Sequence, residues 1–190
     1  MNTRPHSFTD YLAKFGNLSP ELIQSVDKKI KVSVFAKKTI LLKAGKVCEY
    51  LYFIEKGMAR NISEEDDRVF TNDIVLEGEI LVSFASFVSQ KPSVESIELL
   101  EDSTLSCLHY DDLQDLYTDF PELEKIGRKI AEYHYNSLAI KTHQLRFFSS
   151  TQRYQHLFDT KIEIIKRAPL GIIASYLGMT IENLSRIRNK

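Results

Sequence analysis

The spacing of apolar residues changes along the chain, and each change predicts a different kind of structure. Ser19 and Pro20 supply a helix N-cap and a proline at the first helical position, and apolar residues then recur at helical spacing from Leu22 to Ile30. From about Lys31 the spacing falls to two, with β-branched and aromatic residues between glycine turns. This pattern predicts short strands, which favour an antiparallel sandwich or small barrel over βαβ units. We expect them at 32–34, 40–42, 50–54, 58–63, 69–76, 96–100 and 104–109.

Beyond Tyr110 the alternation ends, and a long helix is predicted. Asp119 supplies an acidic cap, Pro121 lies in the first turn, and no stop signal follows until Ser149. Such a helix has about 28 residues and is about 42 Å long, which is longer than its own small domain. Its apolar stripe therefore favours a dimer seam over residues 119–148, with packing on the chain's own sandwich as the alternative. The stripe consists of Leu123, Ile126, Ile130, Tyr133, Ser137, Ile140, Gln144 and Phe147.

The last 40 residues predict a compact helical unit that ends in a helix-turn-helix. A short helix is expected over 153–158. Further on, Ala174 is a small residue where two helices can touch, and Gly178 permits the positive φ of a tight turn. A plain corner between two helices is the alternative, but the register of all these positions favours the helix-turn-helix. The two helices share an apolar face made of Ile173, Leu177, Met179, Leu184 and Ile187.

The second helix of this motif presents a polar and basic face. Thr180 is its expected N-cap and is also counted among the predicted DNA-binding residues. The N-terminal turns of a recognition helix enter the major groove, and arginine, asparagine and glutamate match guanine, adenine and cytosine edges. We therefore predict base contacts for Glu182, Asn183 and Arg186. The predicted contacts to the DNA backbone are Ser185, Arg188 and Lys190.

Charge is distributed unevenly, although the net charge is only −1. Residues 161–190 carry six basic and two acidic side chains. From Val69 to Glu124, by contrast, Lys91 is the only basic residue beside thirteen acidic ones. A basic end on an acidic body is expected when one end of a protein meets a polyanion, with a solvated charged face as the alternative.

Several classes of protein are disfavoured by what the sequence lacks. No apolar run is long enough for a membrane span, and no apolar segment follows the first residues, so a cytoplasmic protein is expected. Cys48 and Cys107 are too few for a disulfide framework or an iron–sulfur cluster, and we expect both to be buried. The histidines have no metal-ligand spacing, and Asp111, Asp112 and Asp115 are typical of a solvated helix start rather than an acid/base site. We therefore predict no catalytic residues, no metal and no cofactor.

The segment Ile173–Arg188 resembles the C-terminal motif of the catabolite-activator/FNR (Crp/Fnr) family of bacterial transcription regulators, especially the forms common in Bacteroidetes. Gly45, the run from Tyr52 to Gly57, and Gly78-Glu79 resemble the turn glycines of the family's cyclic-nucleotide-binding β-roll. The resemblance covers nearly the whole chain. It implies an α+β protein with an antiparallel β-roll (1–116), a dimerisation helix (117–148) and a helix-turn-helix domain (149–190).

The sequence departs from the cyclic-nucleotide-binding members of this family. In those members Gly-Glu opens a short helix that cradles phosphate and ribose, and an Arg followed by Ser or Thr lies about ten residues on. Here Ser93-Val94-Glu95-Ser96 contains no arginine. Burying a phosphodiester without a bidentate cation is costly, so the resemblance implies a pocket that is changed in ligand or empty, and poor binding of cyclic AMP. The candidate effector residues are Gly78, Glu79, Lys91, Ser93, Glu95 and Ser96.

Together these patterns predict a homodimeric regulator that binds double-stranded DNA and is controlled by an unidentified small molecule. The alternative is a small-molecule-binding signalling module whose helical tail contacts a protein rather than DNA. The basic charge of the last 30 residues favours the first interpretation.

Overall fold

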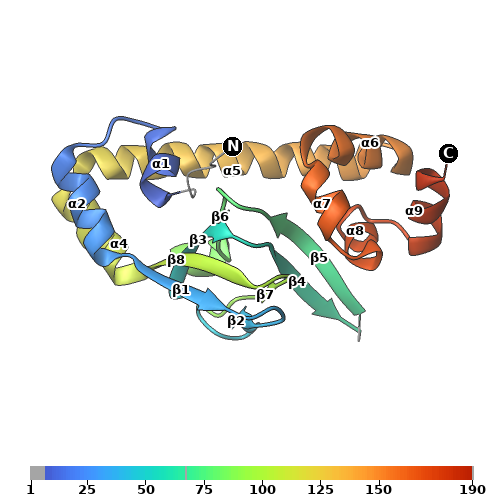
Figure 1. Ribbon diagram of the computed structural model, residues 1–190, viewed down its shortest axis with the longest axis horizontal. Coiled ribbons are helices and arrows are strands. Elements are labelled where there is room, and N and C mark those ends of the chain that lie inside the picture. Colours follow the sequence, from blue (N-terminus) through green and yellow to red (C-terminus); the bar gives the residue numbers. More distant parts are fainter. Residues whose placement is uncertain (1–6, 67, 190) are drawn as a thin grey trace.

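The computed structural model describes residues 7–66 and 68–189, and Figure 1 shows its layout. The long helix α5 (Pro121–Phe147) runs along one side of a β-roll. The helices α1 (Phe8–Ala13), α2 (Pro20–Lys29) and α4 (Tyr110–Asp119) lie at one end of α5, and the C-terminal helices lie at the other. The expected mixed architecture, with an antiparallel β-roll followed by a long helix and further helices, is confirmed.

Within the described residues, the β-roll consists of two antiparallel sheets with strand orders β1-β8-β3-β6 and β2-β7-β4-β5. Every predicted strand is present. The sequence pattern did not reveal β6, which has two residues, or the short helix α3 (Phe84–Ser89) that follows it. The strands are β1 (Lys31–Phe35), β2 (Ile40–Leu42), β3 (Tyr50–Lys56), β4 (Ala59–Glu65), β5 (Arg68–Val75), β6 (Ile80–Leu81), β7 (Ser96–Leu99) and β8 (Ser103–His109).

The N-terminal helices close one end of the β-roll. The Ser19 hydroxyl accepts from the Leu22 backbone N–H, so the predicted cap of α2 is confirmed. Phe8 and Tyr11 of α1 pack on Phe53 of β3, with ring centroids 5.8 Å apart in both pairs. The aspartates at the start of α4 are not simply solvated, because Asp112 and Asp115 both bind the Lys29 ammonium, at 2.8 and 2.9 Å.

The start of α5 corrects one prediction. Asp119 does not cap this helix, because it is the last residue of α4. The N-cap position is occupied by Phe120, which makes no side-chain cap, and Pro121 takes the first helical position. The apolar stripe of α5 divides into two parts. Leu123 and Ile126 are buried in the chain's own core, whereas the stripe beyond Ile130 is exposed except at the half-buried Gln144.

The C-terminal helices pack on the β-roll as well as on one another. Ser149 caps α6 in a reciprocal capping box with Gln152, so the short helix expected at 153–158 begins earlier and runs to Thr160. Met58, Ile74 and Leu100 of the β-roll share one buried apolar cluster with residues of α6 to α9. These helices are α6 (Ser150–Thr160), α7 (Ile162–Arg167), α8 (Leu170–Tyr176) and α9 (Ile181–Arg188).

Two further predictions can be compared with the structure. Both cysteines are buried, as expected, and burial raises the pKa of Cys107 to about 11, so its thiol stays protonated at neutral pH. In the described part of the chain, no helix is both long and apolar enough to cross a membrane.

Candidate DNA-binding and effector sites

The segment after Pro169 has the geometry of a helix-turn-helix. Gly178 has φ +62°, as predicted for the tight turn between α8 and α9. The Thr180 hydroxyl accepts from the Asn183 backbone N–H at 3.2 Å, which confirms Thr180 as the N-cap of α9. Ala174 and Leu184 are buried between the helices. The other members of the predicted apolar face are buried (Ile173, Leu177) or half-buried (Met179, Ile187).

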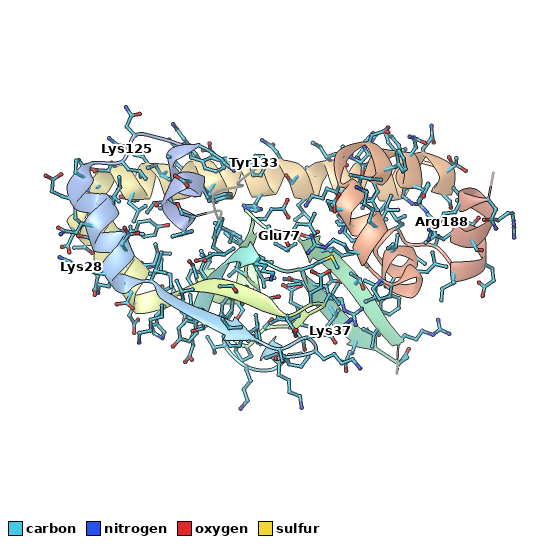
Figure 2. The ribbon with its side chains drawn as sticks, viewed as in Figure 1. Lys28, Lys37, Glu77, Lys125, Tyr133 and Arg188 are labelled. Atoms are coloured by element: carbon cyan, nitrogen blue, oxygen red, sulfur yellow. The ribbon has the colours of Figure 1, made fainter. Side chains whose placement is uncertain are left out.

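Three of the predicted DNA-contacting side chains are exposed on α9, namely Glu182, Arg186 and Arg188. Figure 2 shows Arg188 pointing away from the rest of the molecule at the outer end of the C-terminal helices. Its own backbone N–H and the Thr180 hydroxyl lower the pKa of Glu182 below its ordinary value, so this carboxylate is an acceptor at neutral pH.

The remaining predicted contacts are placed differently. Ser185 is half-buried. The Asn183 amide donates to the Ser150 hydroxyl of α6 at 3.1 Å, so this side chain is directed toward α6 rather than along the exposed face. Lys190 lies outside the described residues. The exposed face also includes Ile181, an apolar side chain that is 48% exposed.

Arg153 of α6 holds the turn of the motif in place. Its guanidinium donates to the backbone carbonyl of Leu177 at 2.8 Å, to that of Gly178 at 3.3 Å and to that of Phe148 at 2.7 Å. Charge-assisted bonds to three carbonyls fix α6, the end of α5 and the turn relative to one another. The sequence analysis missed this role, because no local pattern distinguishes an arginine that binds distant carbonyls from a solvated one.

Part of the basic charge of residues 161–190 is neutralised within the chain, so not all of it is available to a polyanion. Arg167 donates to both carboxylate oxygens of Glu77, at 2.7 and 2.9 Å, and also pairs with Glu101. Lys161 pairs with Glu79 at 2.7 Å. Figure 2 places Glu77 between the strands and the helices that cover them. These pairs join the C-terminal helices to the acidic β-roll.

A second set of contacts joins α8 to β5 and α5. The Ser175 hydroxyl accepts from the Thr71 backbone N–H at 2.8 Å. The Lys141 ammonium of α5 lies 3.9 Å from the ring centroid of Tyr176 and donates to the Asn72 carbonyl. Burial lowers the pKa of Lys141 and raises that of Tyr176. The first helix of the motif is therefore in direct contact with the β-roll.

Gly78 and Glu79 do not open a helix, unlike the Gly-Glu pair of the cyclic-nucleotide-binding members, and their assignment to an effector pocket stays a prediction. They lie in the turn between β5 and β6, where Gly78 has φ +79° and donates to the Ile54 carbonyl at 2.8 Å. The Glu79 carboxylate is bound by Lys161 and by the Leu76 backbone N–H. The short helix of this region is α3, whose N-cap is Ser83.

The other candidate effector residues lie around the segment between α3 and β7. Lys91 is exposed. The Ser96 hydroxyl accepts from the Ala44 backbone N–H at 2.9 Å, and the Ser93 hydroxyl lies 2.9 Å from that of Ser83. Glu95 accepts from two asparagine side chains that the sequence analysis missed, Asn61 of β4 and Asn72 of β5.

No three His, Cys, Asp or Glu side chains in the described ranges lie close enough together to hold a metal ion.

Comparison with known proteins identifies a family model and solved structures that are similar to this chain. The family model for the cyclic nucleotide-binding domain matches residues 32–120. The search of curated proteins found no match.

Solved structures of bacterial regulators share the fold at low sequence identity. The regulator CLP from Xanthomonas campestris, described as responsive to c-di-GMP, is 19% identical, covers 90% of each chain and has a TM-score of 0.67. A Crp/Fnr-family regulator from Eubacterium rectale is 16% identical over 95% of this chain and 86% of its own, with a TM-score of 0.72. A CooA variant from Carboxydothermus hydrogenoformans is 18% identical over 100% of this chain and 84% of its own, with a TM-score of 0.69. Residues 32–120 thus match the cyclic nucleotide-binding domain, and the chain shares the fold of the Crp/Fnr transcriptional regulators.

Proposed function

We propose that this protein is a homodimeric, sequence-specific DNA-binding transcriptional regulator, and not an enzyme. The observation that carries the proposal is α9, a capped helix that follows a positive-φ glycine turn and exposes Glu182 and Arg186 on one face. These side chains suit cytosine and guanine edges in the major groove, and Arg188 suits a phosphate. Such a regulator works in the cytoplasm, where its DNA is.

Dimerisation through α5 is part of the proposal. Tyr133, Ile140 and Phe147 are spaced seven residues apart and are exposed in the single chain. A seven-residue apolar repeat is the pattern of a helix that packs along a second helix. Two copies related by a two-fold axis would then present two α9 helices to an inverted repeat with half-sites about 34 Å apart.

We further propose the predicted division of labour, with a sensory β-roll over 1–116, a dimerisation helix over 117–148 and a DNA-binding domain over 149–190. The β-roll is proposed to take a small-molecule effector other than cyclic AMP. In support, the positions after α3 carry Ser93 and Glu95, and neither supplies a cation for a phosphodiester.

The test is selection of bound sequences from random double-stranded oligonucleotides with the full chain, with and without a cell metabolite extract. We expect enrichment of an inverted repeat, and a change in its yield with the extract. The matched control is a variant with Glu182→Ala and Arg186→Ala, which removes two exposed side chains and should abolish the enrichment. If the unmodified protein enriches no sequence, the alternative, a helical tail that contacts a protein, is favoured.

A further inference from the structure

The side chain of Asn61 in β4 leaves an unpaired acceptor inside the β-roll. Its amide nitrogen donates to the Val82 carbonyl and to Glu95 Oε1, both at 3.1 Å. Because both partners are acceptors, a 180° flip of the amide, which exchanges its nitrogen and oxygen, would lose both hydrogen bonds. Asn61 is 7% exposed. Within residues 7–66 and 68–189, its Oδ1 is the one buried polar side-chain atom that has no hydrogen-bond partner. A buried acceptor in this state is destabilising until a donor reaches it.

The carboxylate beside it carries a charge that no cation neutralises. Glu95 Oε1 accepts from Asn61, and Oε2 accepts from the Asn72 amide at 3.1 Å. Among the described residues, Glu95 forms no ion pair. Two neutral amides orient this carboxylate and leave its negative charge in place.

Two buried hydroxyls next to this cluster, those of Ser83 and Ser93, already use their hydrogens. Ser93 donates its hydroxyl hydrogen to the Glu95 carbonyl at 2.7 Å. The Ser83 hydroxyl, 2.9 Å from Ser93 Oγ, must therefore be the donor of that pair. Both serines are buried. What the cluster offers to a ligand is consequently an acceptor and a negative charge.

We infer that the effector site of the β-roll takes a small organic cation with N–H donors, such as a primary ammonium or a guanidinium, at the cluster of Asn61, Asn72 and Glu95. One N–H satisfies Asn61 Oδ1, and the positive charge is stabilised by Glu95. An anionic ligand would be repelled by the Glu95 charge. This inference rests on the proposed function, because it names the chemical class of the effector.

The cluster is linked to the DNA-binding helices by contacts already described. Asn72, whose side chain binds Glu95, has its carbonyl bound by Lys141 of α5. The Lys141 ammonium in turn lies over the ring of Tyr176 in α8. A ligand that competes with Asn72 for Glu95 would therefore act on a residue that is one contact away from α5 and two from α8.

The test follows the side-chain amide NMR signals of Asn61 and Asn72 in the isotope-labelled full chain, assigned with Asn61→Ser and Asn72→Ser variants. The probes are methylammonium, guanidinium and putrescine, with tetramethylammonium as a cation that lacks N–H donors. Inorganic phosphate and cyclic AMP are the anionic probes. We expect saturable shifts at millimolar concentration with the N–H-bearing cations, and none with tetramethylammonium or the anions.

The matched variants are Glu95→Gln, which keeps the size and one acceptor oxygen, and Glu49→Gln, which removes an exposed carboxylate of the same β-roll. Glu95→Gln should weaken binding of the cationic probes by about tenfold or more, and Glu49→Gln should leave it unchanged. The inference is overturned if no cation gives saturation, which would mean that a water molecule satisfies Asn61. Equal or tighter binding of phosphate or cyclic AMP, or an unchanged affinity in Glu95→Gln, would overturn it too. None of these measurements uses DNA, so their outcome does not depend on whether the protein binds DNA.

Discussion

Gly57 lies in the turn between β3 and β4, where both the positive φ and the close contact with Ser103 require glycine. Its φ is +109°, and an added Cβ would lie 2.8 Å from Ser103 Cβ and 2.9 Å from Ser103 Cα. The backbone conformation alone costs a non-glycine residue about 1–2 kcal/mol, and overpacking adds about 1–3 kcal/mol. We expect Gly57→Ala to lower the free energy of unfolding in urea by about 2–4 kcal/mol. Gly45→Ala is the control, because Gly45 also has positive φ but faces open space, and its loss should be about 1–2 kcal/mol.

The ion pair of Glu77 with Arg167 predicts a pH dependence of stability. Burial raises the pKa of Glu77, but Arg167 and the Gly57 backbone N–H outweigh it, and the net pKa is below its ordinary value. A carboxylate with a depressed folded pKa stabilises the fold above its unfolded pKa, and this contribution is lost as the pH falls through the folded pKa. We therefore expect Glu77→Gln to lower the free energy of unfolding by roughly 1 kcal/mol at pH 7, since the pair is partly exposed.

Urea unfolding at several pH values checks this expectation. The difference between the unmodified protein and Glu77→Gln should shrink as the pH falls below about 4.3. Glu163→Gln is the control, because it removes an exposed i,i+3 pair with Lys166 and should change little at any pH. A difference that stays constant down to pH 3, about one unit below the ordinary glutamate pKa, would show that the Glu77 charge contributes nothing.

At the scale of elements, the geometry of α9 divides its arginines by expected role. Arg186 is exposed one helical turn after Glu182, which lies in the first turn of α9, whereas Arg188 is the last residue of the helix. Arg186→Ala should cost roughly 1–3 kcal/mol on the preferred site and relax one base position in each half-site. Arg188→Ala should weaken all sequences similarly and reduce the salt slope by about one unit per subunit. Competition binding against substituted sites would contradict the assignment if the two variants gave the reverse pattern.

Elements with a local signal were predictable, and those defined by distant contacts were not. Ser19, Ser149 and Thr180 act as caps through bonds to residues only three positions away. The short strand β6, by contrast, exists because two residues pair with β3, and no periodicity appears over such a length. Gly127, in the interior of α5, also depends on a distant contact. An added Cβ would lie 3.0 Å from Tyr117 Cζ of α4, so the close approach of these two helices requires glycine. Helix propensity alone disfavours glycine at this position.

At the scale of the whole molecule, the candidate sites could be predicted only where their residues lie close together in the sequence. The helix-turn-helix is one continuous segment, and its turn, cap and apolar face were all identified from spacing. The ion pair between Arg167 and Glu77 joins residues far apart in the sequence, and charge counting assigned that arginine to a polyanion instead. Asn61, Asn72 and Glu95 come from three separate strands and loops, so no motif revealed their cluster.

The exposed part of the α5 stripe, rather than its buried part, is where a dimer interface can be tested. Ile130 packs against the chain's own core, so Ile130→Glu would destabilise the single chain and could not report on a dimer. Ile140 and Phe147 are 57% and 71% exposed in the single chain. We expect the double variant Ile140→Glu, Phe147→Glu to remain folded but sediment as a monomer, because two unpaired carboxylates would be buried at the seam. Thr142→Glu, on the opposite side of α5, is the control and should remain dimeric. Monomers should also lose affinity for an inverted repeat, since only one α9 can then bind each site. A stable monomer of the unmodified protein would rule out the dimer, and a dimer that survives both glutamates would place the interface elsewhere.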